Sequence, residues 1–299
     1  MTTMIESAKA WLTALPHVQY RKDKYFYLKY DGAYAVAFAA ALVAMRATNF
    51  QPLVPKVQPW CFAALPVVMY LTILAHVFIH NASHGNFGKT FNRVVGEILG
   101  VLVFTRFASW EVIHTRHHIH SDDRELDPHP VIPSYFKYVL RTLISVEAQL
   151  MQAYVDQWGD TPENRRREKL RSVVSFSTGA LLFACWYCLL GPAGFVLFVL
   201  VPTVFALCFV VHFNWCTHNA TSPNGPYHPV DQDHGYYWFG NRIFFGIYFH
   251  GIHHARANLF NPMKGVGRFE LTPATMAPPF RPELQAAYAR QHADVEARA

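Results

Sequence analysis

The sequence predicts an all-α integral membrane protein, with four transmembrane helices in two hairpins and a helical cap on the cytosolic side. Composition is the first observation behind this prediction. Of the 299 residues, 52% are hydrophobic and 15% are charged, whereas soluble domains carry about 25% charged residues. Long uncharged segments are the second observation, and an uneven distribution of Lys and Arg is the third. This composition excludes a disordered chain and argues against a soluble enzyme.

Three uncharged segments are long enough to cross a bilayer, whose apolar core needs about 20 helical residues. They are residues 60–79, 172–190 and 195–213. The last two form a hairpin, because only the turn Gly191-Pro192-Ala193-Gly194 separates them. A fourth apolar run, residues 33–50, contains Arg46, whose long side chain can extend to the membrane interface. We expect it to pair with residues 60–79 as the other hairpin.

The distribution of positive charge predicts the orientation. Of 26 Lys and Arg residues, only two are expected on the outer side: Arg46, near the outer end of the first expected span, and Lys56, in the loop that follows it. Because positive loops stay in the cytosol, we expect both termini and the large middle loop there, with a bacterial inner membrane as the location. The chain is then a single membrane domain, residues 1–299, whose cap comprises residues 80–171 and 214–299. The net charge of +6 follows from this topology, and no nucleic-acid partner is expected.

Histidine is concentrated in two windows, and its spacing there is helical. Fifteen of the 17 histidines lie between His76 and His129 or between His212 and His254. The segments HNASH, HTRHH and HGIHH each place their histidines three or four residues apart, on one face of a helix. In NWCTH an asparagine precedes a histidine by four residues. All four segments lie at the expected cytosolic surface, so they can converge on metal. The candidate ligands are His80, His84, His114, His117, His118, Asn214, His218, His250, His253 and His254.

The number of imidazoles indicates which metal. A catalytic zinc site has three protein ligands, so nine histidines exceed the need of two such sites. Calcium and magnesium prefer oxygen ligands. A histidine-rich site of higher coordination, with a position open for oxygen, suits iron best, although zinc and copper compete by affinity. The sequence therefore predicts two iron ions with four or five histidines each.

Neighbouring residues are expected to orient these ligands. A metal-bound histidine normally donates its second N–H to a carboxylate or a carbonyl, and Asp123 and Asp127 are candidates for this role. His76, one helical turn before His80, is a further candidate, although a packed and hydrogen-bonded core histidine is the simpler interpretation. Spacing singles out none of the other histidines in the two windows, which are His120, His129, His212, His228 and His234. His17 and His292 lie outside both windows and are expected to be dispensable for turnover.

The three histidine segments resemble the histidine boxes of the integral-membrane fatty acid desaturases and hydroxylases. The stretch that ends in Asp127-Pro128-His129, and the spacing of Asn214 and His218, are similar to the acyl-CoA desaturase branch. The resemblance covers about residues 60–254. It implies that the nine histidines ligate two irons and that Asn214 holds a water. The first box has three intervening residues, as in acyl-lipid desaturases and alkane hydroxylases, whereas the acyl-CoA branch usually has four.

The resemblance implies an oxygen-dependent fatty acyl desaturase that acts on a long-chain acyl substrate. The same boxes also fit a hydroxylase, a carotenoid ketolase and a fatty acid decarboxylase that makes terminal alkenes. A metal-binding membrane transporter or receptor is the non-enzymatic alternative. Transporters place polar groups at mid-membrane, whereas these ligands are expected at the inner surface, which argues against that alternative.

Electrons are expected from a separate carrier, because the sequence has no flavin, nicotinamide or fused haem signature. A ferredoxin, a rubredoxin or a small cytochrome fits this role. Basic residues near the boxes can receive an acidic carrier or the anionic head of the substrate, or contact lipid headgroups. These residues are Arg106, Arg116, Arg124, Arg256 and Lys264.

Overall fold

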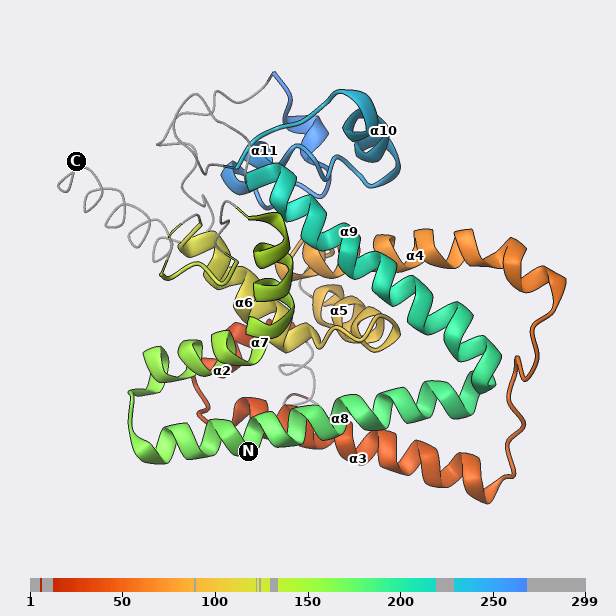
Figure 1. Ribbon diagram of the computed structural model, residues 1–299. Coiled ribbons are helices and arrows are strands. Elements are labelled where there is room, and N and C mark those ends of the chain that lie inside the picture. Colours follow the sequence, from red (N-terminus) through yellow and green to blue (C-terminus); the bar gives the residue numbers. More distant parts are fainter. Residues whose placement is uncertain are drawn as a thin grey trace.

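Figure 1 shows the computed structural model, which describes residues 6, 13–88, 90–121, 123, 125–129, 134–218 and 229–267. The regular structure of these residues is helical and contains no β-strand, which confirms the all-α prediction. In chain order, the α-helices are α2 (Pro16–Tyr20), α3 (Phe26–Ala47), α4 (Pro59–Ser83), α5 (Phe91–Leu102), α6 (Phe107–Ile119), α7 (Tyr135–Trp158), α8 (Pro162–Phe195), α9 (Val201–His218), α10 (Gly235–Ile243) and α11 (His250–Ala255). A π-helical turn, Val196–Leu200, joins α8 to α9, and a 3₁₀ turn, Pro262–Gly265, follows α11.

Three helical segments of the described chain are long and apolar enough to cross a membrane: Phe26–Ala47, Pro59–Ser83 and Pro162–His218. The third comprises 57 residues, well over the roughly 20 residues that one crossing needs. It reverses direction at Gly191, whose φ of 76° and ψ of 171° are not helical. In Figure 1, α8 therefore runs beside α3, and α9 returns beside α4.

The turn at Gly191 is tied to the loop before α4. The backbone N–H groups of Leu53 and Val54 donate to the carbonyl oxygens of Leu189 and Leu190, at 2.9 and 3.0 Å. A Cβ atom at Gly191 would lie 3.0 Å from a side-chain atom of Pro52, so the close approach requires glycine as much as the positive φ does. This contact holds the two helix pairs together at the end that we expect outside the membrane.

Helix α3 begins earlier than the expected span at residue 33. Its first turns carry Phe26, Tyr27 and Tyr30, which are buried in a cluster with residues of α6 and α7. Sequence hydropathy did not mark these turns as part of a span because tyrosine and the neighbouring Asp31 lower it. Their burial against α6 and α7 extends the helix beyond the apolar run that the sequence predicts.

A group of five charged side chains, here named the charge network, links α3, α6, α7 and α8. Its members are Asp31, Arg106, Glu147, Glu168 and Arg171. Arg106 donates to Asp31 Oδ1 at 2.8 Å and to Glu147 Oε1 at 3.0 Å. Arg171 donates to Glu147 Oε2 at 2.6 Å and to Glu168 Oε2 at 3.1 Å. Buried charges are tolerated when they are paired in this way.

His17 has a structural role that its position in the sequence did not indicate. It is buried on α2, its backbone N–H donates to Glu111 Oε2 at 2.9 Å, and its ring pairs with the same carboxylate. Glu111 precedes His114 on α6 by one helical turn, so this contact fixes α2 against the helix that carries the second histidine box. His292 lies outside the described residues.

Candidate metal centre

Four helix ends bring the candidate ligands together. The last turn of α4 carries His80, and His84 caps its C-terminus. Helix α6 carries His114, His117 and His118 in its last two turns, and His218 is the final residue of α9. Helix α11 contributes the remaining three, which are His250, His253 and His254. The nine predicted histidines thus lie at one end of the two helix pairs, although they come from segments up to 174 residues apart in the sequence.

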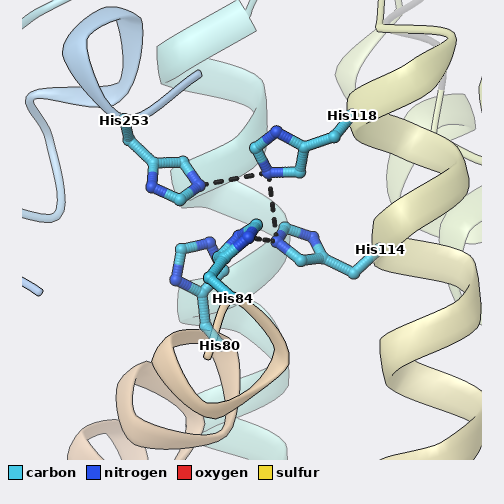
Figure 2. Close-up of side chains that lie close together, drawn as sticks. All are labelled: His80, His84, His114, His118 and His253. Atoms are coloured by element: carbon cyan, nitrogen blue, oxygen red, sulfur yellow. Dashed lines mark hydrogen bonds between the residues drawn. The ribbon is translucent and has the colours of Figure 1, made fainter. Parts of the chain in front are cut away.

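These histidines form two groups, and in each group one ligand atom from every residue lies within 4.8 Å of the others. The first group comprises His80, His84, His114, His118 and His253. Figure 2 shows these rings pointing toward one another from α4, α6 and α11. The Nε2 atom of His114 lies 2.8 Å from His84 Nε2 and 3.2 Å from His118 Nε2, and His253 Nε2 is 3.1 Å from His118 Nε2.

The second group comprises His117, His218, His250 and His254. The Nε2 atom of His250 lies 2.9 Å from His218 Nε2 and 3.1 Å from His254 Nε2. The two groups adjoin, since the rings of His118 and His254 stack with centroids 4.2 Å apart. This adjacency is what a pair of neighbouring metal ions requires.

Hydrogen bonds between the rings cannot account for all of these nitrogen–nitrogen contacts. A neutral imidazole has one N–H and one acceptor nitrogen, so the single Nε2 proton of His118 cannot serve both His114 and His253. His80 Nε2 is buried without a hydrogen-bond partner. A cation that accepts a lone pair from every ring satisfies all of these atoms together. The residues therefore fit a metal ion in each group.

The spacing of the nitrogens is compatible with a shared ion. Two nitrogens bound at about 2.1 Å to one ion lie about 3.0 Å apart at a right angle and about 3.4 Å apart at a tetrahedral angle. Five Nε2 pairs lie 2.8 to 3.2 Å apart, so a single ion can contact neighbouring nitrogens of a group.

Burial favours the neutral form of His118, His253 and His254. It lowers the pKa of His118 well below its usual value, and the neighbouring His84 and His117 lower it further. The pKa of His253 and that of His254 fall well below the usual value for the same two reasons. A neutral ring keeps the lone pair that binds a metal. These rings can therefore bind a metal at neutral pH without first losing a proton.

Asp127 orients one of the ligands, whereas Asp123 does not. His117 Nδ1 donates to Asp127 Oδ1 at 2.9 Å, and the backbone N–H of His129 donates to the same oxygen at 2.7 Å. Burial opposes ionisation of Asp127, but His117 and this N–H outweigh it and hold the carboxyl pKa below its usual value. Asp123 Oδ1 instead accepts two backbone N–H groups, from Glu125 and Leu126, and so stabilises a turn.

His76 is a packed core histidine. Its Nδ1 donates to the carbonyl oxygen of Thr72 at 2.8 Å, and its Nε2 lies 3.4 Å from Thr105 Oγ1. The residue lines the cavity beside His80 but belongs to neither histidine group.

An apolar cavity of about 50 Å³ reaches the histidines from between α4 and α9. Ile73, Val77, Phe209 and Phe213 supply its apolar walls, and Asn214 lines it together with rings from both histidine groups. A hydrocarbon group in this cavity therefore lies next to the imidazoles of both groups.

A model of the fatty acid desaturase family matches residues 57–290, which is more than half of the chain. The chain belongs to the fatty acid desaturase family. Searches of curated proteins and of solved structures found no match. Members of this family are membrane-bound oxidoreductases that generally depend on iron, in agreement with the apolar helices and the histidine groups described above.

Two further residues lie at the candidate metal centre, although histidine spacing did not single them out. The ring of Trp110 stacks on His114, with centroids 5.5 Å apart and an interplanar angle of 16°. His129 lines the cavity, and its ring centroid lies 6.1 Å from that of His117. Trp110 precedes His114 by one turn, and His129 belongs to the Asp-Pro-His segment. Both sequence signals were present, but neither by itself distinguishes a site residue from a packed one.

Arg106 and Arg116, two of the five basic residues expected to receive a partner, form ion pairs within the described chain. Arg106 belongs to the charge network, and Arg116 donates to Asp156 Oδ2 at 2.5 Å. Lys264 is exposed, while Arg256 is half-buried and also makes contacts of its own. Arg124 lies outside the described residues. Because Arg106 and Arg116 already have partners, a carrier or an anionic headgroup has to compete for them.

Proposed function

We propose that the protein is an oxygen-dependent fatty acyl desaturase that holds two iron ions. The observation that carries this proposal is the pair of adjoining histidine groups at the end of an apolar cavity. The family match supports an oxidoreductase that acts on fatty acyl chains, and the number of histidines in each group supports two ions that are bound mainly by nitrogen.

The two histidine groups divide the ligands between the ions. The group around His114 holds one ion with five imidazoles, and the group around His250 holds the other with four. Asn214, which lines the same cavity, would hold a water molecule that binds the second ion. When bound, iron supplies the activation of molecular oxygen that removal of hydrogen from an unactivated methylene requires.

The protein itself positions the substrate and excludes water. The apolar walls at Ile73, Val77, Phe209 and Phe213 bind an acyl chain and keep solvent from the histidines. Asp127 holds His117 in the orientation that points its Nε2 away from the carboxylate and toward the other rings of its group. Desaturation removes two hydrogen atoms from the acyl chain. Together with two protons from solvent and two electrons from a separate carrier, such as a ferredoxin, a rubredoxin or a small cytochrome, they reduce one oxygen molecule to two waters.

A hydroxylase, a carotenoid ketolase and a terminal-alkene-forming decarboxylase use the same type of ligands. Desaturation is favoured by the Asp127-Pro128-His129 segment and by the spacing of Asn214 and His218. Deuterated saturated acyl chains, fed to cells that express the protein, distinguish these reactions by mass spectrometry. We expect loss of two deuterons from neighbouring carbons. A new hydroxyl on a chain of unchanged length, or a hydrocarbon one carbon shorter, would contradict desaturation.

The proposed topology has four crossings, with both termini and the metal centre in the cytosol of a bacterial cell. The reversal at Gly191 supports two crossings within the segment Pro162–His218. A reporter inserted between Gln51 and Gln58 is expected outside, and reporters at Pro162 and at the C-terminus inside. A C-terminus on the outside would mean that α3 does not cross the membrane.

A further inference from the structure

A second cavity lies between α3, α5 and α8, on the side of α5 that faces away from α4 and α9. Its volume of about 100 Å³ exceeds the 50 Å³ of the cavity at the histidines. The two cavities share no lining residue, and the second is lined by no histidine within the described chain. This cavity therefore does not belong to the metal centre.

One end of the second cavity is polar, and the charged side chains there are paired with side chains of opposite charge. The hydroxyl groups of Tyr30 and Tyr34 donate to Glu97 Oε2 at 2.5 and 2.7 Å, and Arg93 Nε donates to Glu97 Oε1. Arg106, which also lines the cavity, is held by the charge network. A tyrosine hydroxyl whose proton is donated still accepts a hydrogen bond. The polar end consequently offers acceptors, such as Tyr34 Oη, to a ligand that brings its own donor.

The other end of the cavity is apolar and reaches the surface of α8. Phe38, Phe104, Leu182 and Phe183 line it, and Phe183 is 39% exposed on a helix that is expected to face lipid. The rings of Phe104 and Phe183 lie 4.4 Å apart between centroids. Phe104 has a φ of +57°, which is strained for a bulky residue and which the surrounding structure must maintain. Phe104 lies in the connection between α5 and α6, and it forms part of the cavity wall.

A glycine on α8 leaves the cavity wall open. A Cβ atom added at Gly179, which lines the cavity, would meet no atom within 4 Å. A larger side chain at this position can therefore enter the space without displacing the helices.

We propose that this cavity binds an uncharged, hydroxyl-bearing amphiphile from the bilayer, of the long-chain alcohol class. The ligand hydroxyl donates to Tyr34 Oη, and its hydrocarbon chain lies along Phe104 and Phe183 past Gly179. A carboxylate or phosphate headgroup is disfavoured, because Glu97 lies at the polar end while Arg93 and Arg106 already pair with carboxylates. The proposal depends neither on the metal nor on the proposed reaction.

Photo-labelling of the purified full-length protein in detergent micelles tests this proposal, with a diazirine-bearing hexadecanol as the probe. We expect the label on residues 101–107 and 178–183. Gly179→Leu fills the cavity and should reduce labelling there at least tenfold, and Gly179→Ala should give an intermediate reduction. Gly32→Leu is the matched control, because Gly32 is a glycine of α3 whose added Cβ would also meet no atom within 4 Å. Its labelling should equal that of the unchanged protein.

Two results would overturn the proposal. One is equal labelling of the unchanged protein and a folded Gly179→Leu variant, and the other is equal labelling by the matching diazirine hexadecanoic acid. If Gly179→Leu does not elute as a folded protein in size-exclusion chromatography, Tyr34→Phe carries the test. That variant removes the acceptor and should reduce labelling by the alcohol at least threefold, and unchanged labelling would contradict the proposal.

Discussion

The charge network and the histidine groups are two polar regions at the same end of the helix pairs, and they are satisfied in different ways. In the charge network, every acidic side chain accepts from an arginine at 3.1 Å or less. In the histidine groups, imidazole nitrogens face one another at 2.8 to 3.2 Å, with no carboxylate between them. In the first region each carboxylate is paired with an arginine of the protein, although Asp31 Oδ2 and Arg171 Nη2 are buried without a hydrogen-bond partner. In the second region the nitrogens require a cation.

This difference separates structural polar groups from ligand-binding ones in an apolar protein. A buried ion pair satisfies its own charges and fixes helices relative to one another. A set of converging neutral imidazoles does not hold its helices together until a metal binds. Removal of a residue from the first region should therefore reduce stability, and removal from the second should reduce metal content and turnover.

The largest expected effect is the loss of turnover when a ligand is removed. His118→Ala or His254→Ala deletes an imidazole from one group, and we expect each variant to be inactive with reduced metal content. The exposed His234, whose ring meets that of Tyr237 edge to face, provides the matched control His234→Ala. Product formation and metal content are the measurements. A fully active His218→Ala enzyme would show that the assignment of this residue to the second group is wrong.

A large loss of stability is expected when the charge network is broken. Arg171→Ala leaves the buried Glu168 and the half-buried Glu147 without this partner, and loss of one member of a buried pair such as Arg171–Glu168 costs about 3–5 kcal/mol. Arg165→Ala removes an exposed pair with Asp160, which contributes little to stability because water screens it. Denaturation in detergent measures both. Similar midpoints for the two variants would mean that the charge network does not hold α7 and α8 together.

A smaller effect is expected from the carboxylate that orients a ligand. Asp127→Asn preserves the size of the side chain but weakens its bond to His117, so metal affinity should fall about 10- to 100-fold. Competition with a chelator measures this. Asp123→Asn is the control, because Asp123 contacts only backbone groups of its turn in the described structure and should leave affinity unchanged. Equal metal affinities for both variants would show that Asp127 does not help to orient His117 for metal binding.

Sequence periodicity predicted the long apolar helices, although α3 begins before the expected residue 33, and it placed on helix faces the histidines that the structure brings together. Residues such as His114 and His118 lie on one face of one helix, so local spacing defines their geometry. It could not separate Asp127 from Asp123, because the contact with His117 depends on how the chain folds after α6. The pairing of Arg106 with Asp31 joins residues 75 positions apart, and no local pattern predicts such a contact.

The central claim is that two ions bind in the two histidine groups, and metal analysis combined with X-ray absorption spectroscopy tests it most directly. Protein purified from iron-replete cells should contain about two irons per chain, with first-shell scattering almost wholly from nitrogen and, where water or Asn214 contributes, from oxygen. The His234→Ala variant should give the same result, and His118→Ala should give less iron. One zinc per chain, or sulfur in the coordination shell, would contradict the account.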